Sequence, residues 1–272
     1  MTDSWSNASQ APPELETNLP QSARVWNYWL GGKDNFPADR AAGDQFREIF
    51  PEIVDAARAA RGFLARAVHY LAGEAGVRQY LDVGTGIPTA NNTHEVAQRV
   101  APESRIVYVD NDPIVLAHAR ALLTSTPQGA TAYIDADLRD PDRILREAGQ
   151  TLDFSQPTAL MLLGILGHVG DLEEARSIVK RLLDALPSGS YLVLNDGTAV
   201  VNKARVEEAQ ELYNQSGAVP YHPRTPEQIA GFFEGSELLE PGVVSCSRWR
   251  PDADGGDLPA EVDMFGGVGR KP

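Results

Sequence analysis

The chain has 272 residues, of which 42% are hydrophobic, and its 24 Lys and Arg against 38 Asp and Glu give a formal net charge of −14. At about 150 residues per domain, this length indicates one large domain or two small ones. The negative charge disfavours nucleic acid as a partner, because binding to phosphates depends on Lys and Arg. A single cysteine, Cys246, excludes an internal disulfide and offers no zinc cluster, so no metal site is expected.

The sequence also bears on where the protein works. A membrane span needs roughly 18 apolar residues, and the longest apolar run, 159–166, is shorter and contains a glycine. Residues 1–18 include acidic side chains and lack the apolar centre of a secretory signal. We therefore expect a cytoplasmic protein without a membrane partner, and the sequence leaves its oligomeric state open.

The N-terminal part of the chain divides into two predicted segments. Residues 1–21 are rich in Ser, Asn, Gln and Pro, which predicts a flexible tail. Residues 22–76 are predicted to form a helical cap or lid, with clustered aromatic residues followed by apolar residues at helical spacing from Ile53 to Leu71. The remainder, 77–272, is predicted to be one domain.

Strands and helices are predicted to alternate through this domain. Strands are expected at 79–84, 105–112, 131–138, 158–166 and 190–196, helices at 93–100, 113–125, 171–186 and from Thr225, and two antiparallel strands at 237–249 and near 262–268. Such alternation indicates right-handed βαβ units. The expected fold is α/β: a doubly wound, Rossmann-like, mostly parallel sheet with an antiparallel C-terminal strand and an N-terminal helical cap.

Acidic residues and glycines follow three successive strands. In Asp82-Val83-Gly84-Thr85-Gly86, the two glycines let the backbone turn tightly and approach a ligand. Asp110 ends the next strand, near the offset of roughly 20 residues expected for a carboxylate that binds a ribose diol, and Asp137 ends the third. Because the carboxyl ends of parallel strands share one edge, the pattern predicts a nucleoside ligand. The alternative is a tight turn with solvated carboxylates.

The sequence of the loop after the first strand indicates which class of nucleoside ligand is expected. A dinucleotide fingerprint has a third glycine where Thr89 stands, and it opens a helix at once, whereas here the helix is expected only near Thr93. Asp82 would also repel a pyrophosphate. These features favour a cationic ligand that carries an amino group and a sulfonium.

From about Gln79 to the C-terminus, the chain resembles the class I S-adenosylmethionine-dependent methyltransferases. The resemblance lies in the segments LDVGTG, VYVDND and DADL. The longer segments VWNYWLGGKDNFPADR, DVGTGIPTANNTHEVAQ and YVDNDPIVLAHARALL are similar to an actinobacterial family of S-adenosyl methyltransferases, formerly a domain of unknown function. The resemblance implies S-adenosylmethionine as cofactor, S-adenosylhomocysteine as product, and a methyl acceptor, expected to be a small molecule, that the sequence does not identify.

The resemblance also implies which residues hold the cofactor. Asp82, Gly84 and Gly86 would surround its methionine part. Asp110 would hold the ribose hydroxyls. The other expected contacts are Asn111, Asp112, Asp137 and Leu138 near the adenine, Leu163 and Gly164 near the methionine, and Thr85 and Asn92 in the loop.

The aromatic segment supplies candidate lid residues. Trp26 and Tyr28 can attract a sulfonium through their ring faces, and Arg24 or Lys33 can pair with the methionine carboxylate. Asn27 completes this group. The alternative is an N-terminal helix whose aromatic side chains only cover a sheet edge.

His168, just after the fourth strand, is the first candidate for a general base, ahead of His94 and His222. For each histidine, packing is the competing interpretation, and methyl transfer can also proceed by positioning alone. Two other functions stay open: an NAD-dependent oxidoreductase, and a non-catalytic S-adenosylmethionine-binding regulatory protein.

Overall fold

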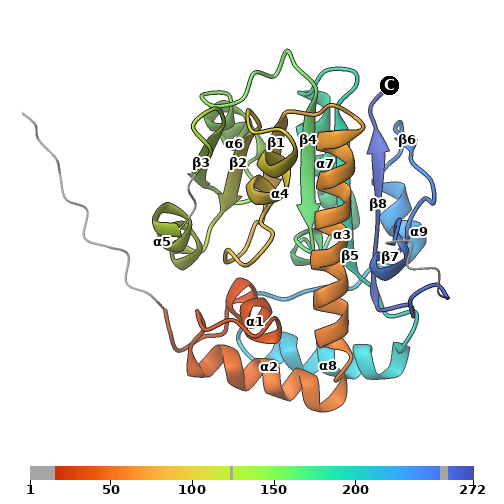
Figure 1. The fold of residues 1–272 in the computed structure, drawn as a ribbon. Helices are drawn as coiled ribbons and strands as arrows, with labels where there is room; N and C mark the ends of the chain where they lie inside the picture. Colours follow the sequence, from red (N-terminus) through yellow and green to blue (C-terminus); the bar gives the residue numbers. More distant parts are fainter. Residues whose placement is uncertain (1–15, 123–124, 252–256) are drawn as a thin grey trace, which may run out of the picture.

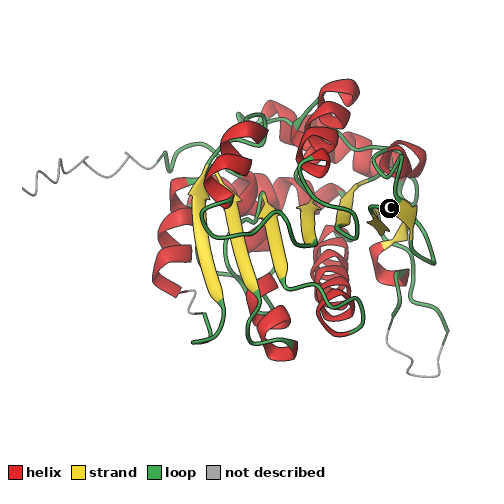
Figure 2. Ribbon diagram, turned by 90° about the horizontal axis from the view of Figure 1, so that it is seen from above, coloured by secondary structure: helices red, strands yellow, loops and turns green. Residues whose placement is uncertain are grey.

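Side chains on both faces of the central strands are buried. Such burial is typical of a parallel sheet covered by helices on each side, and Figure 2 shows helices on both sides of the sheet. The computed structural model describes residues 16–122, 125–251 and 257–272, and in them the sheet has eight strands. Parallel strands run in the order β3 (Ala130–Asp135), β2 (Arg105–Asp110), β1 (Gln79–Val83), β4 (Thr158–Leu163) and β5 (Tyr191–Gly197). Antiparallel to β5 lies β8 (Met264–Arg270), which also pairs with β6 (Glu237–Leu238) and β7 (Val244–Ser245).

Alternating strand residues pack against two helical layers. Tyr80 and Met161 face a core that includes α3 (Ile53–Gly73), whereas Leu81 and Leu160 face the core under the opposite helices. The first layer also contains α4 (Thr93–Val100), and its core continues onto α1 (Ser22–Trp29), α2 (Pro37–Ile49) and α8 (Lys203–Gln215). The second contains α6 (Pro141–Ala148), α7 (Leu172–Asp184) and α9 (Pro226–Gly231), and α5 (Pro113–Leu122) packs beside β3. None of the helices in the described part of the chain is both long and apolar enough to span a membrane.

The α/β class, the mostly parallel sheet and the antiparallel C-terminal strand are confirmed. One predicted strand, 237–249, is wrong. Its residues form β6, β7 and the short 3-10 helix η2 (Cys246–Arg248). Pro241 and Gly242 lie between the two short strands, and proline has no N–H to donate to a sheet ladder. Helix α6 is an addition to the predicted elements, whereas α2 lies within residues 22–76, which were expected to be helical.

Helices α1, α2 and α8 lie together beyond the carboxyl ends of the parallel strands, as Figure 1 shows. The buried Asp39 carboxylate fixes the start of α1 and α2, because it accepts hydrogen bonds from the backbone N of Gln21 at 2.9 Å and of Phe36 at 2.7 Å. Most of the predicted tail, residues 1–15, lies outside the described residues. Just after it, the Glu16 carbonyl accepts a hydrogen bond from Arg24 Nη1 at 2.8 Å.

Candidate cofactor-binding site

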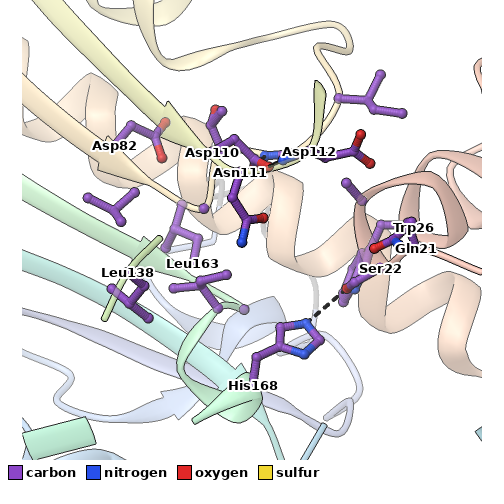
Figure 3. Close-up of a pocket in the computed structure, with 18 of the residues that line it drawn as sticks. Gln21, Ser22, Trp26, Asp82, Asp110, Asn111, Asp112, Leu138, Leu163 and His168 are labelled. Atoms are coloured by element: carbon purple, nitrogen blue, oxygen red, sulfur yellow. Dashed lines mark hydrogen bonds between the residues drawn. The ribbon is translucent and has the colours of Figure 1, made fainter. Parts of the chain in front are cut away.

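A cavity of about 370 Å³ opens at the carboxyl edge of the sheet, with α1 across from the strand ends (Figure 3). The strand ends that line it are 82–87, 110–112, 136–139 and 163–165. The helical residues that line it are Ser22, Ala23, Trp26, Asn27, Ala60, Arg61 and Leu64. The predicted strand-end residues therefore lie around one space.

The glycine loop shapes one wall of this cavity. Gly84 and Gly86 have φ angles of +74° and +67°, a left-handed conformation that favours glycine. A Cβ on Gly84 would lie 2.5 Å from the side chain of Ile165, whereas a Cβ on Gly86 would meet nothing within 4 Å. The backbone at Gly86 therefore borders open space, where a ligand can approach it closely.

Asp110 is held in place by the backbone. Its Oδ2 accepts a hydrogen bond from Gly86 N at 2.9 Å, and its Oδ1 accepts one from Asp112 N at 2.9 Å. Burial raises the pKa of Asp110 to about 6. Each carboxylate oxygen keeps further lone-pair capacity, so this group can accept two more hydrogen bonds from a pair of hydroxyls.

Asp82 is the second buried carboxylate of the cavity. It is 3% exposed, and its Oδ2 accepts a hydrogen bond from Thr93 Oγ1 at 2.6 Å. Burial raises the pKa of Asp82 to about 6. Asn92 does not line the cavity. It caps α4 and accepts a hydrogen bond from Thr89 N at 3.0 Å, and it thereby holds the loop that brings Thr93 to Asp82.

Arg24 and Asp112 form a buried ion pair. Arg24 Nε and Nη2 each donate to the Asp112 carboxylate at 3.1 Å, and the two side chains are 2% and 8% exposed. The pair ties α1 to the end of β2. Arg24 thus has a protein carboxylate as its partner, whereas its charge alone predicts the methionine carboxylate.

The other predicted lid residues divide into two groups. Trp26 and Asn27 line the cavity. Tyr28 and Lys33 do not: the Tyr28 hydroxyl donates to Asp44 Oδ1 on α2 at 2.6 Å, and Lys33 is exposed.

Arg61 also lines the cavity, although it is not among the cofactor-binding residues expected from the sequence. Its Nη2 donates to the carbonyls of Ala90 at 3.0 Å and Asn91 at 3.1 Å, while its buried Nε has no hydrogen-bond partner. Burial lowers the pKa of Arg61, and the nearby Asp82 carboxylate opposes that shift. A signal was available, because Arg61 interrupts the buried helical stripe that runs from Ala57 to Leu64.

His168 ends η1 (Leu166–His168) at the opposite side of the cavity from Asp110. Its Nδ1 lies 3.0 Å from the Pro220 carbonyl, and its Nε2 lies 3.0 Å from Ser22 Oγ. A carbonyl only accepts, so Nδ1 carries the proton and Nε2 accepts a hydrogen bond from the Ser22 hydroxyl. Burial lowers the pKa of His168, and the ring is therefore neutral near pH 7.

The other predicted residues also have definite places. Thr85, Asn111, Asp137, Leu138, Leu163 and Gly164 line the cavity. His94 does not, because its Nδ1 lies 2.8 Å from the Tyr108 hydroxyl in the protein interior. His222 lines a separate groove beside α8.

These features define a class of protein. The strand order, the glycine loop with an open backbone and the fixed carboxylate at the end of β2 are those of a Rossmann-like protein that binds a nucleoside. The cavity also offers both a carboxylate, Asp82, and a guanidinium, Arg61, for a ligand that carries an amino group and a carboxylate.

Comparison with known proteins identifies the family. The model of the S-adenosyl methyltransferase family matches residues 8–272, so the chain belongs to this family. A DUF574 family protein from Streptomyces avermitilis is 48% identical, with a TM-score of 0.90 over 94% of this chain and 99% of its own. A protein from Thermobifida fusca YX, assigned to the methyltransferases, is 40% identical, with a TM-score of 0.87 over 97% of this chain and 99% of its own.

A more distant structure shares the fold alone. An S-adenosylmethionine-dependent methyltransferase from Anabaena variabilis is 15% identical with a TM-score of 0.51, covering 97% of this chain and 99% of its own. No curated protein matches the chain. The chain is thus an S-adenosylmethionine-dependent methyltransferase, and this assignment disfavours the NAD-dependent alternative.

Proposed function

We propose that the cavity binds S-adenosylmethionine with its ribose on Asp110 and that the enzyme transfers the methyl group to a small molecule. The observation that carries the proposal is the Asp110 carboxylate, fixed by two backbone N–H groups beside the open backbone of Gly86. A carboxylate in a fixed position loses little freedom when it accepts the two ribose hydroxyls.

The two ends of the cavity differ in the groups they offer. Beyond Asp110, the side chains of Asn111, Asp137 and Leu138 line the wall and would hold the adenine, with Leu138 packing near the ring. On the other side of Asp110, Asp82 would accept from the ammonium of the methionine part, and Arg61 would donate to its carboxylate. Leu163 and Gly164 border this end.

The protein's own groups would favour the reaction by position and by exclusion of water. When bound, the cofactor supplies a methyl group activated by a sulfonium. Trp26 and Asn27 of α1 cover the cavity as a lid and limit the access of water. His168 Nε2, which accepts a hydrogen bond from Ser22 Oγ at 3.0 Å, would accept a proton from the acceptor once the acceptor displaces that hydroxyl. This enclosure supports an acceptor of small size.

Calorimetric titration with S-adenosylmethionine, S-adenosylhomocysteine and NAD tests the proposal. We expect binding of the first two and none of NAD, and we expect Asp110→Ala to weaken binding at least about thirtyfold, since hydrogen bonds to a charged group are lost. The matched control is Asp135→Ala, which removes an exposed carboxylate that does not line the cavity. Equal affinities of the two variants would contradict the placement of the ribose.

A second experiment addresses the non-catalytic alternative. The protein is incubated with S-adenosylmethionine and with the small-molecule fraction of a cell extract, and release of S-adenosylhomocysteine is followed over time. A release rate that depends on the extract and disappears when the extract is omitted supports methyl transfer. Tight binding without any release would support a regulatory protein.

A further inference from the structure

A second, smaller pocket of about 50 Å³ adjoins the cofactor cavity. Ser22, Trp26 and His168 line both spaces, so these three side chains form a common wall. A water molecule needs roughly 10–15 Å³ of such space. The pocket therefore has room for the head of a small molecule and none for a folded polypeptide.

Aromatic rings form a large part of the wall of this second pocket. Trp29 lies 5.7 Å from Trp26 and 5.2 Å from Phe46, measured between ring centroids. Phe46 is in turn 6.2 Å from Tyr213, and Tyr221 is 5.1 Å from His168. Phe50, Ile53, Val206, Pro223 and Met264 add apolar contacts, and the polar lining residues are Ser22, His168, Thr198, Gln210 and Asp263. Such a surface favours an apolar molecule, and a flat ring above all.

The carboxylates near the pocket are already satisfied. Asp263 accepts hydrogen bonds from the backbone N of Val200 and Val201 at 2.8 Å and of Asn202 at 2.9 Å. Asp196, behind Tyr221, forms a fully buried ion pair with Arg224 at 2.8 Å. Neither carboxylate is available to attract a cation, and the paired Arg224 is not available to attract an anion. The pocket thus favours an uncharged ligand.

One polar group on the common wall, His168 Nε2, has a hydrogen-bond partner that a ligand can replace. His168 Nε2 is a hydrogen-bond acceptor, and the donor that it meets is the Ser22 hydroxyl at 3.0 Å, as Figure 3 shows. The ring cannot turn freely, because Nδ1 is held by the Pro220 carbonyl and Tyr221 packs against it edge to face. A ligand hydroxyl can therefore take the place of Ser22 Oγ without any movement of the imidazole.

We infer that this pocket binds the reactive end of the methyl acceptor, a small uncharged aromatic molecule whose hydroxyl replaces Ser22 Oγ as the donor to His168 Nε2. The inference rests on the proposed function. In the reaction, the acceptor oxygen forms a bond to the methyl carbon as the carbon–sulfur bond breaks, and the electron pair of that bond stays on sulfur. The hydroxyl proton passes to His168 Nε2 and then to solvent.

The test uses nuclear magnetic resonance on the full chain labelled with ¹⁵N at histidine and saturated with S-adenosylhomocysteine. Three probes of similar shape are titrated: phenol, toluene and the cation of benzylamine. We expect phenol to shift the Nε2 resonance of His168 and to bind about fivefold more tightly than either other probe, the gain of one hydrogen bond. His168→Gln identifies the resonance and removes the preference for phenol.

Two further variants sharpen the result. Ser22→Ala removes the competing donor, so phenol should bind more tightly than to the unchanged protein. His69→Gln, which changes an exposed histidine of α3, should alter neither affinity. Equal binding of phenol and toluene, tightest binding of benzylamine, or a phenol-induced shift confined to other histidines would overturn the inference. Failure of S-adenosylhomocysteine to bind would instead overturn the proposed function.

Discussion

The cofactor cavity and the adjoining aromatic pocket are built in different ways. The cavity uses short segments that directly follow strands, 82–87, 110–112 and 136–139, together with backbone groups that those segments fix. The aromatic pocket uses single side chains from elements far apart in the chain, from Ser22 in α1 to Met264 in β8. A site of the first kind depends on a contiguous motif, whereas residues of the second kind can be exchanged one at a time. This difference predicts that the identity of the cofactor is fixed, whereas the identity of the acceptor can change through single substitutions in the aromatic pocket.

The largest expected effect comes from the ion pair that joins the two regions. Arg24→Met leaves the Asp112 carboxylate buried without its partner, which should lower the free energy of unfolding by about 3–5 kcal/mol. Urea unfolding followed by circular dichroism measures the change. As a control, Arg205→Met removes the exposed pair with Glu52 and should cost less than about 1 kcal/mol. Similar losses for both variants would mean that α1 is not tied to β2 by this contact.

Acid should weaken cofactor binding strongly. The pKa values of Asp82 and Asp110 are raised to about 6 by burial, and binding of the ammonium and the ribose requires both carboxylates to be ionised. Affinity for S-adenosylmethionine should therefore fall about tenfold per carboxylate, and about a hundredfold in all, between pH 7 and pH 5. Calorimetry across this range measures it.

The same shifts predict an opposite trend for the free protein. A carboxylate whose pKa is raised by folding binds its proton more tightly in the folded state, so these two groups add stability as the pH falls from about 6 to about 4. Asp82→Asn removes the contribution of one carboxylate from the pH dependence of cofactor affinity and from the pH dependence of stability. An affinity that is constant from pH 7 to pH 5 would show that the cofactor does not depend on these charges.

Gly86→Ala, compared with a control glycine, distinguishes the effect of filling the cavity from the effect of backbone strain in the turn. The new methyl group would project into the open space beside Asp110, so affinity for S-adenosylmethionine should fall about tenfold or more, with about 1 kcal/mol lost in stability at its φ of +67°. Gly235→Ala is the matched control, since Gly235 has a φ of +81° and open space around it but lies outside the cavity. It should lose similar stability and keep its affinity.

The smallest effect is expected at Arg61. Arg61→Met removes the partner of the methionine carboxylate and should weaken S-adenosylmethionine binding about fivefold. Binding of 5′-methylthioadenosine, which lacks the amino and carboxylate groups, should stay unchanged. Arg58→Met, at an exposed position of the same helix, serves as the control. Equal weakening of both ligands would place Arg61 in a purely structural role.

The sequence predicts the cofactor side of the molecule well because its signals are local. Alternating strands and helices determine the order of elements, and Asp82, Asp110 and Asp137 are placed by the carboxyl ends of the strands at which they lie. The residues of the lid are harder to place. The charge of Arg24 predicts a ligand carboxylate as its partner, but only the packing of α1 beside the end of β2 shows that Asp112 is within its reach.

The aromatic pocket could not be predicted, because its residues share no spacing along the chain. Phe46, Tyr213 and His168 belong to three elements that meet only after α2, α8 and η1 pack together. The error at 237–249 has a different origin. There the apolar residues Val243 and Val244 predict a continuous strand, but Pro241 and Gly242 interrupt it and leave two short strands.

The contacts around Asp112 have a kinetic consequence. Its backbone N donates a hydrogen bond to the Asp110 carboxylate, the proposed ribose site, and its side chain holds Arg24 of α1, the helix that also lines the proposed acceptor pocket. Binding of the ribose at Asp110 would therefore stabilise α1, the helix against which the acceptor would bind. We expect a compulsory order in which the cofactor enters first and its demethylated product leaves last, so that this product competes with fresh cofactor and slows turnover as it accumulates.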